Sequence, residues 1–575
     1  MRRRHVFIPL FLVLLSYMIC LTFFFEIDVE ASNGYPVSNL DTGLNYTTIQ
    51  AAINANETQD GHRIWVDSNR TYYEHVVVNK SISLFGHEVC TTFIDGSGTG
   101  TAITITKGNV NITGFTMQNS VRYSHAGIHL KNVSHCNITG NIVLNNYYGV
   151  HLDRSSGNTI SGNHFGGCGL YVAESYSNIV VGNSVNGKPL VYLEGVSDLV
   201  VNDAGQVILV SCNNISVESL NLSYASIGVE MWKTNHTRIA RNKIADNKCG
   251  IRLYGSSCNN TIMVNTVTAN NWDGIRLYGS SYNNTISSNN VTDNYYGISL
   301  YAASYNNTIL GNNVTNNLYG IQLYVSSNNT ISENTVTKNH EYGISLYASS
   351  NNTVLGNRVT VNNWDGIRLH SSLNNIISRN TITTNHEFGI RFESSSCNNT
   401  ISGNNIANNW DGIHLYVSSN NTISGNTVTA NLDDGLCLRG SHCNNIAENN
   451  VTSHSIGIYL DGSLGNLICR NNFMNNFDQV ASYGSANSWN GSYSCGGNYW
   501  SDYTNIDEKK GPKQDQPGSD GIWDHPYVID ENNIDHYPMV PEFSFTLIPF
   551  TFMIATLLVV IAYKRRRTMQ ERRVT

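Results

Sequence analysis

Apolar and polar positions alternate along most of the chain in a repeating unit. From Gly250 to Gly457, a Gly followed by Ile or Leu recurs ten times, at steps of 24, 23 or 22 residues. Each unit reads roughly G-I-x-L-Y-x-S-S-x-N-N-T-I-x-x-N-x-V-T-x-N, and its apolar residues follow the two-residue period of a strand. Short strands joined by tight polar corners are expected. A unit of about 23 residues without a helical half fits one coil of a parallel β-helix.

Equivalent residues of successive coils should lie above one another, at a strand spacing of about 4.8 Å. Two apolar columns, Ile251 to Ile413 and Leu253 to Leu415, are predicted to fill the core. Two Asn columns, Asn260 to Asn421 and Asn265 to Asn426, are predicted to form amide ladders at the corners. Most of the 81 Asn among the 575 residues are therefore predicted to be structural, and chain length measures coils rather than domains.

The ends of the chain differ from the repeat. Arg2 to Arg4 precede an apolar run, which indicates an export signal, with an uncleaved anchor as the alternative. Residues 545–563 are apolar and precede four basic residues, which predicts a transmembrane helix with the rest of the chain outside the cell. The predicted segments are a signal peptide (1–31), an N-terminal cap with the first coils (32–100), irregular coils with an insert (101–245), regular coils (246–486), a C-terminal cap (487–543), and a transmembrane helix with a basic cytoplasmic tail (544–575).

Composition narrows the class of partner. A formal net charge of −8 gives no basic footprint for nucleic acid, so that partner is set aside. Eleven of the 12 Cys follow the signal, without metal-finger spacing, and their disulfide pairing cannot be assigned. The chain also has 21 Asn-x-Ser/Thr sequons, as expected of an exported glycoprotein, although seven of them belong to the repeat itself.

Several segments carry a family resemblance. They are Thr48-Ile49-Gln50, Asn79 to Gly86, the insert Asn186 to Gly195, the Asn-Asn-Thr-Ile coils, Gly497 to Tyr503, and Asp535 to Pro538. Together they resemble the NosD-type periplasmic copper-binding proteins, within the wider group of carbohydrate-binding and sugar-hydrolysis (CASH) repeat domains. The resemblance implies an all-β fold, a right-handed parallel β-helix, and a role in copper supply. Pro541 to Phe543 and the following span resemble a PEF-CTERM sorting signal of archaeal surface proteins, whose tail is removed and replaced by a lipid anchor.

The first candidate site is aromatic. A Tyr column follows the Gly on the outward face and is continued by His370, Glu393 and Tyr416, and three Trp-Asp-Gly-Ile units each add a Trp. Such rings could stack on the sugars of a polysaccharide, or they could form a cross-strand ladder that stabilises the sheet. The residues are Tyr254, Tyr278, Tyr301, Tyr324, Tyr347, Trp272, Trp364 and Trp410.

The second candidate site is acidic. Carboxylates just before the Gly, with Glu387 offset by one position, precede a partly basic column. Stacked carboxylates could divide acid and base roles in a glycosidase or lyase, or hold calcium. The same charges could instead neutralise one another as exposed ion pairs, and the recurrence of the unit speaks against one unique active site. The catalytic candidates are Asp365, Glu387, Asp411, Asp434, Arg368, Arg391 and His414.

The third candidate site is a pair of histidines on neighbouring coils. His129 and His151 occupy the same outward position, where two imidazoles could share copper. The alternative is a pair of surface histidines, because no Met or Cys lies in register.

These observations favour an exported, membrane-anchored β-helix protein that binds a polysaccharide or cell-surface glycan without catalysis. A polysaccharide lyase, esterase or hydrolase is the first alternative, and a copper-binding accessory protein is the second. Copper and calcium are the two metals that the sequence leaves open. The oligomeric state and the identity of the glycan are left open as well.

Overall fold

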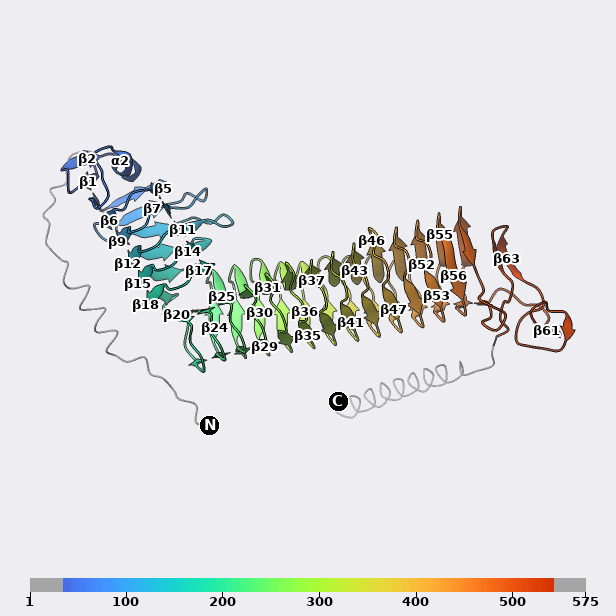
Figure 1. Ribbon diagram of the computed structural model, residues 1–575. Helices are drawn as coiled ribbons and strands as arrows, with labels where there is room; N and C mark the ends of the chain where they lie inside the picture. Colours follow the sequence, from blue (N-terminus) through green and yellow to red (C-terminus); the bar gives the residue numbers. More distant parts are fainter. Residues whose placement is uncertain (1–34, 542–575) are drawn as a thin grey trace, which may run out of the picture.

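The described chain is an elongated β-helix. The computed structural model describes residues 35–541, which form a right-handed parallel β-helix of about 19 turns (Figure 1). The predicted all-β, right-handed parallel β-helix is confirmed. Within residues 35–541, no helix has the length and apolarity that a membrane crossing requires. The predicted signal peptide (1–31) and the predicted C-terminal transmembrane helix lie outside the described residues.

The first stack has three strands in each coil. One coil consists of β12 (Asn137–Thr139), β13 (Ile142–Leu144) and β14 (Tyr148–Asp153). Each strand pairs in parallel with its equivalent in the next coil, as β14 does with β17 (Leu170–Ala173). The only α-helix of the described chain, α2 (Ile49–Asn54), packs over the first coil as the sequence suggested, and the Thr48 hydroxyl caps it by accepting from the Ala51 amide at 3.0 Å.

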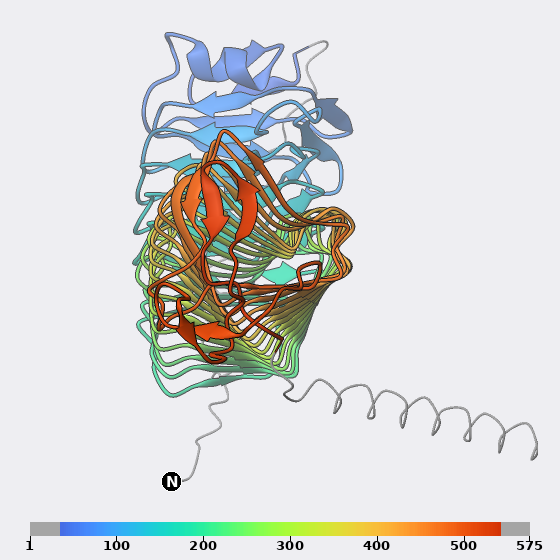
Figure 2. The same ribbon diagram turned by 90° about the vertical axis from the view of Figure 1, so that its right-hand side faces the viewer.

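A hairpin joins this stack to a second one. β19 (Ser184–Val185) pairs antiparallel with β20 (Lys188–Glu194), after which parallel pairing resumes in β22 (Gln206–Val210). The two stacks meet at an angle in Figure 1, while Figure 2 looks along the second stack and shows its coils superimposed. We call this junction the elbow. The long sheet of the second stack continues through β25 (Ile227–Trp232), β28 (Cys249–Tyr254), β31 (Asp273–Tyr278), β34 (Tyr296–Tyr301), β37 (Tyr319–Tyr324), β40 (Ile344–Tyr347), β43 (Ile367–His370), β46 (Ile390–Glu393), β49 (Ile413–Tyr416), β52 (Asp434–Arg439), β55 (Ile456–Asp461) and β58 (Asp478–Tyr483).

Side chains of the second stack seal the open edge of β17. The Leu170 backbone N–H donates to the Gln206 side chain at 3.0 Å, and the Gln206 amide donates back to the Leu170 carbonyl at 2.7 Å. The Val172 amide donates to the Glu230 carboxyl at 3.3 Å. An unpaired strand edge would invite pairing with another chain, so these contacts both close the edge and fix the elbow.

Asn ladders hold the corners, as predicted. In the ladder through Asn312, each backbone N–H and each side-chain NH₂ donates to the side-chain oxygen of the Asn in the next coil, at 2.9 Å for Asn312 and Asn334. The predicted Ile and Leu columns are fully buried between these corners. A third buried ladder, from Asn247 through Asn270 and Asn294 to Asn431, was not predicted.

The Gly column has a steric cause. A Cβ atom at Gly297 would lie 2.6 Å from both the Gly320 carbonyl oxygen and a methyl carbon of Val314. Because the coils stack this closely, only Gly fits at this position in the strands from β25 to β55.

Residues 487–541 cover the last coil, at the red end of Figure 1, where the sequence suggested a cap. Trp489 and Trp500 are buried there. The Asp535 carboxylate accepts from the Asn498 amide at 2.7 Å and from the Trp500 indole N–H at 3.0 Å, so this acidic side chain anchors the cap.

Candidate functional site

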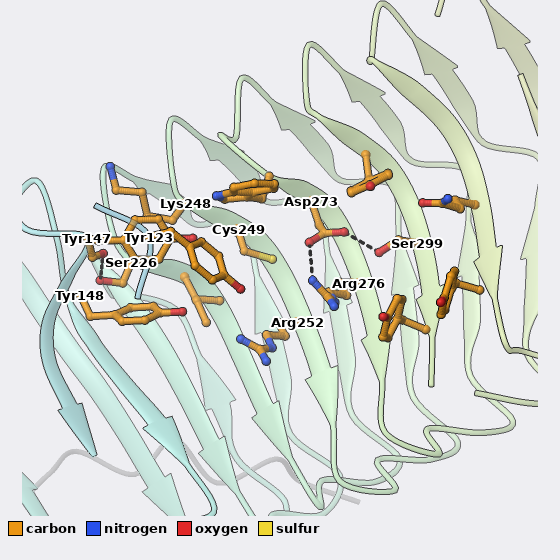
Figure 3. Close-up of a pocket in the computed structure, with 16 residues that line it drawn as sticks. Tyr123, Tyr147, Tyr148, Ser226, Lys248, Cys249, Arg252, Asp273, Arg276 and Ser299 are labelled. Atoms are coloured by element: carbon orange, nitrogen blue, oxygen red, sulfur yellow. Dashed lines mark hydrogen bonds and ion pairs between the residues drawn. The ribbon is translucent and has the colours of Figure 1, made fainter. Parts of the chain in front are cut away.

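The elbow contains a cleft whose walls come from both stacks. One lobe has a volume of about 540 Å³, within the range of about 300–1,000 Å³ typical of ligand pockets. Figure 3 shows tyrosines of the first stack facing charged side chains of the second. The residues of the two stacks that matter most are Tyr123, Tyr147, Tyr148, Lys248, Arg252, Trp272, Asp273, Arg276, Ser299 and Tyr301.

Tyr123 lies in the loop between β10 (Thr116–Gln118) and β11 (Ala126–Lys131) and is 65% exposed. Its ring makes edge contacts with Tyr147 of the first stack, at a centroid distance of 5.3 Å, and with Trp272 of the second, at 5.5 Å. Tyr123 therefore bridges the two walls and presents an accessible aromatic surface in the cleft.

Arg252 is the central cation of the cleft. Its guanidinium lies 5.1 Å from the Tyr171 ring centroid and 5.3 Å from that of Tyr254, and its buried Nε has no hydrogen-bond partner. Burial raises the pKa of the neighbouring Glu230 to about 8, so this carboxyl is largely protonated at neutral pH. No carboxylate of the described chain lies within ion-pair distance of Arg252, and its Nε has no hydrogen-bond partner.

The other charges of the cleft are partly compensated. Arg276 forms an ion pair with Asp273 at 3.1 Å, and Asp273 also accepts from the Ser299 hydroxyl at 2.5 Å. Lys248 lies 5.9 Å from the Tyr147 ring centroid, and burial lowers its pKa. This lobe thus has more basic than acidic side chains, in a chain of net charge −8.

A second lobe of about 490 Å³ adjoins the first and shares Tyr123, Arg252, Arg276 and Tyr301 with it. Tyr171 and Tyr278 line it as well. A groove with two lobes could take more than one residue of a linear ligand, with the two arginines in contact with both lobes.

The predicted Tyr column is an aromatic ladder. Tyr301 and Tyr324 stack at a centroid distance of 4.6 Å with an interplanar angle of 8°, and Tyr324 and Tyr347 stack at 4.9 Å and 5°. Tyr278 continues the ladder at one end, 5.7 Å from Tyr301. Because each aromatic ring covers the face of the next, a sugar could reach only the edges of the rings and not their faces.

The other predicted aromatic residues divide between the cleft and the open surface. Tyr254 is buried in the elbow, where its hydroxyl donates to the Val172 carbonyl, so it is not on the outer face that the column predicted. The reason is that β17 covers the first coils of the second stack. Trp272 lines the cleft, whereas Trp364 and Trp410 are roughly half exposed further along the stack, away from the cleft.

The predicted acidic column does not form one site. Asp365 is buried, and its carboxylate accepts a hydrogen bond from the Phe388 backbone N–H at 3.3 Å. Burial raises the pKa of Asp365 to about 7. Glu387 is exposed, and its carboxylate lies 4.0 Å from His386 Nδ1. Phe388 occupies the register position between Asp365 and Asp411, so these two carboxylates are separated by a full coil.

The predicted basic column is occupied by local ion pairs. Arg368 and Arg391 both bind Glu393, with a distance of 3.0 Å for Arg391, and His370 lies 3.0 Å from the same carboxylate. These basic side chains are therefore neutralised by Glu393, which lies outside the acidic column, and not by Asp365. None of the seven predicted catalytic residues lines the elbow cleft.

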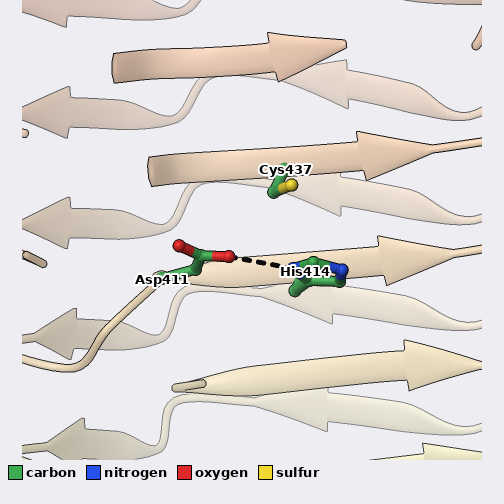
Figure 4. Close-up of side chains that lie close together, drawn as sticks. All are labelled: Asp411, His414 and Cys437. Carbon is green, nitrogen blue, oxygen red and sulfur yellow. Dashed lines mark hydrogen bonds and ion pairs between the residues drawn. The ribbon is translucent and has the colours of Figure 1, made fainter. Parts of the chain in front are cut away.

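Two coils further on, the structure brings Asp411, His414 and Asp434 together with a fourth residue, Cys437. His414 Nδ1 lies 2.9 Å from an Asp411 oxygen, and the Asp434 amide donates to the other Asp411 oxygen at 3.1 Å. One ligand atom each of Asp411, His414 and Cys437 lies within 4.8 Å of the others. Figure 4 shows Cys437 on the strand next to that of His414.

The predicted histidine pair is stacked rather than convergent. The rings of His129 and His151 lie 4.3 Å apart at an interplanar angle of 5°, and His129 Nε2 is 3.7 Å from Asp153. Burial lowers the pKa of His151 to about 3, so this ring stays neutral. Because ring nitrogen lone pairs lie in the ring plane, two parallel rings do not direct them at a common ion.

The sequence missed Tyr123, Glu230 and Cys437, and it treated Arg252 only as part of a basic column. No periodic signal marks Tyr123, which lies in an irregular loop. Cys437 has the same register position as Arg391 and His414. The only sequence feature that could have identified it is therefore a Cys that follows a His in that column.

Fold and site together define a right-handed parallel β-helix protein with a lateral cleft between two stacks. A family model described as periplasmic copper-binding protein (NosD) matches residues 24–199, 194–323 and 389–505, and a model of the right-handed beta helix region matches residues 308–428. The chain belongs to the NosD family.

Other similar proteins cover less of the chain or are more distant. A cell surface glycoprotein of Methanothermus fervidus is 32% identical over 171 residues, which cover 24% of this chain and only 28% of that relative. The A-module of a mannuronan C-5 epimerase from Azotobacter vinelandii is 16% identical, covers 69% of this chain and 97% of its own, and has a TM-score of 0.35. The Dettilon tailspike protein is 18% identical, covers 51% of this chain and 63% of its own, and has a TM-score of 0.39. At these values the likeness to solved structures does not extend to function.

The family description implies copper, and the two groups of candidate ligands differ in how well they fit it. The stacked pair His129 and His151 does not fit, because the lone pairs do not converge. Asp411, His414 and Cys437 offer oxygen, nitrogen and sulfur donors close together, a set that suits copper or zinc.

Proposed function

We propose that the protein is an exported cell-surface β-helix protein that binds an acidic glycan in the elbow cleft, without catalysis. The observation that carries the proposal is Arg252, a half-buried cation whose Nε is buried without a partner and which pairs with no carboxylate of the described chain. A carboxylate or sulfate of a sugar would supply the missing negative charge and hydrogen bonds.

The aromatic walls support a sugar as the ligand. Trp272 and Tyr123 carry accessible ring surface beside Arg252, and the apolar faces of sugar rings stack on such rings. Two adjoining lobes that share Arg252 and Arg276 suit an oligosaccharide rather than a small metabolite.

The surroundings of the one acidic side chain in the larger lobe support binding over catalysis. Asp273 is held by Arg276 and Ser299, so it is already committed as an ion-pair partner. A surface location is supported by the predicted export signal and by the name of the Methanothermus fervidus relative.

The test compares two arginines in the same register of the long sheet. Arg252→Gln removes the unpaired cation, and Arg391→Gln removes one that already binds Glu393 and stacks on Phe388. Gln322 occupies this register naturally, so both variants should fold. On an array of acidic and neutral polysaccharides, we expect wild type and Arg391→Gln to retain an acidic glycan. Arg252→Gln should bind it at least about tenfold more weakly.

Equal retention by all three proteins, or preference for neutral glycans, would refute the proposal. Release of unsaturated or reducing sugar by the wild type would instead favour the enzymatic alternative.

A further inference from the structure

We propose that Asp411, His414, Cys437 and Asp434 bind a single divalent first-row transition-metal ion on the long sheet of the second stack. The site is independent of the elbow cleft, because none of these residues lines it. It joins three kinds of donor atom, a carboxylate, an imidazole and a thiol, on two adjacent coils.

The positions of the four side chains follow from the coil geometry. His414 and Cys437 are register partners in β49 and β52, so their side chains leave the same face of the sheet about 4.8 Å apart. Asp411 and Asp434 occupy the position before Gly in the same two coils. The four groups therefore form a compact square, with one carboxylate and one N or S donor from each coil.

Burial makes the cluster unusual. Asp411, Asp434 and Cys437 are each at least 96% buried, and His414 is only 8% exposed. Asp434 Oδ1 is buried without any hydrogen-bond partner, although buried carboxylate oxygens normally have one. Two carboxylates in adjacent coils, one of them with an oxygen that has no hydrogen-bond partner, form an acidic cluster that a cation would neutralise.

The distances fit an ion with modest side-chain rotation. The donor atoms of Asp411, His414 and Cys437 lie within 4.8 Å of one another, as do carboxylate oxygens of Asp411, Asp433 and Asp434. Metal bonds of about 2.0–2.3 Å to oxygen, nitrogen and sulfur place neighbouring donors roughly 3–4 Å apart. Asp411 Oδ2 lies 2.9 Å from His414 Nδ1, close enough for one ion to bind both atoms.

Other coils of the chain supply conservative variants. The register position of His414 and Cys437 is Gln322 and Ser345 in earlier coils, so His414→Gln and Cys437→Ser place residues there that the sheet already accommodates. Cys212→Ser is the matched control, because Cys212 is equally buried but donates only to backbone carbonyls, at 3.3 Å to Leu193.

The experiment measures bound metal in the purified full-length protein after loading with Zn²⁺ or Cu²⁺ and removal of the excess. Wild type and Cys212→Ser should hold one equivalent more than either His414→Gln or Cys437→Ser. Loading with Co²⁺ should give a thiolate charge-transfer band that Cys437→Ser abolishes. Thermal unfolding should show that only wild type and Cys212→Ser gain stability with metal.

The zinc and copper arms show which ion the site prefers. The proposal is overturned if His414→Gln and Cys437→Ser bind as much zinc and as much copper as wild type. It is also overturned if Cys212→Ser loses as much bound metal as these two variants. Circular dichroism of the metal-free proteins separates loss of the site from loss of the fold.

Discussion

Replacing one Asn of a corner ladder should destabilise the coils on either side of it. In Asn312, the side-chain oxygen accepts from the backbone N–H and the NH₂ of Asn289, both at 2.9 Å. The NH₂ of Asn312 donates to the Ile286 carbonyl and to the Asn334 side chain, also at 2.9 Å. Asn312→Ala removes these four bonds and leaves the buried Asn289 N–H without an acceptor.

The magnitude follows from those contacts. A buried N–H left without a partner costs about 1–3 kcal/mol, and each further lost bond has a net value of about 0.5–1.5 kcal/mol. Since these terms are not additive, we expect Asn312→Ala to lower the free energy of unfolding by about 2–5 kcal/mol. The neighbouring Asn313 is exposed and only donates to Asn290 at 2.8 Å, so Asn313→Ala should stay within about 0.5 kcal/mol of wild type.

Hydrogen exchange is the assay of choice, because the stability of a stacked-coil protein is largely a sum of local interfaces. Amides of residues 286–292 and 309–315 should exchange much faster in Asn312→Ala, with little change in distant coils, and denaturant unfolding should report the overall loss. Equal exchange and equal unfolding in Asn312→Ala and Asn313→Ala would refute the structural role of the ladders.

Three further predictions concern charge and packing. Binding of an acidic glycan should weaken as pH rises through about 8, because ionised Glu230 then neutralises Arg252; Glu230→Gln should remove this pH dependence in calorimetric titrations. Gly297→Ala should destabilise the protein by several kcal/mol in thermal unfolding, since its Cβ would lie 2.6 Å from the Gly320 carbonyl oxygen, and a change under about 0.5 kcal/mol would contradict this steric account. Burial raises the pKa of Asp535 to about 6, so its stabilising contribution is present below about pH 4 and lost as pH rises through about 6, by up to roughly 3 kcal/mol. Wild type should therefore lose more stability between pH 4 and 7.5 than Asp535→Asn, and identical pH profiles would contradict this.

The coils could be predicted from the sequence because several independent patterns in it repeat with the same period. The Gly spacing, the alternating Ile and Leu columns and the Asn corners all repeat with one period, and each has a local physical cause. The third Asn ladder has the same period but was not predicted. Its residues, such as Asn270 and Asn294, are the last residue of each unit, and that position was not examined as a column.

The elbow could not be read from the repeat. It depends on the antiparallel pairing of β19 with β20 and on Glu230 and Gln206 reaching across to β17, a contact between residues about 36 to 58 positions apart that no column encodes. The same covering strand buries Tyr254, which the column alone places on the outer face.

The acidic site was predicted only in part. Asp411, His414 and Asp434 were candidates, but as members of a catalytic column that included Glu387 and Asp365. Side-chain direction and burial decide which members meet, and Cys437 joins them because it follows His414 in register. A periodic sequence fixes which residues share a column, whereas local loop geometry fixes which of them face one another.

The central claim is that Arg252 in the elbow cleft binds the acidic group of a glycan. Its most direct test is a calorimetric titration of the full-length protein with an acidic oligosaccharide and with its carboxyl-reduced, neutral counterpart. Reduction keeps the sugar rings and removes the charge, so we expect a loss of at least about tenfold in affinity with wild type and little difference with Arg252→Gln. Equal affinity of wild type for the two oligosaccharides would contradict the claim.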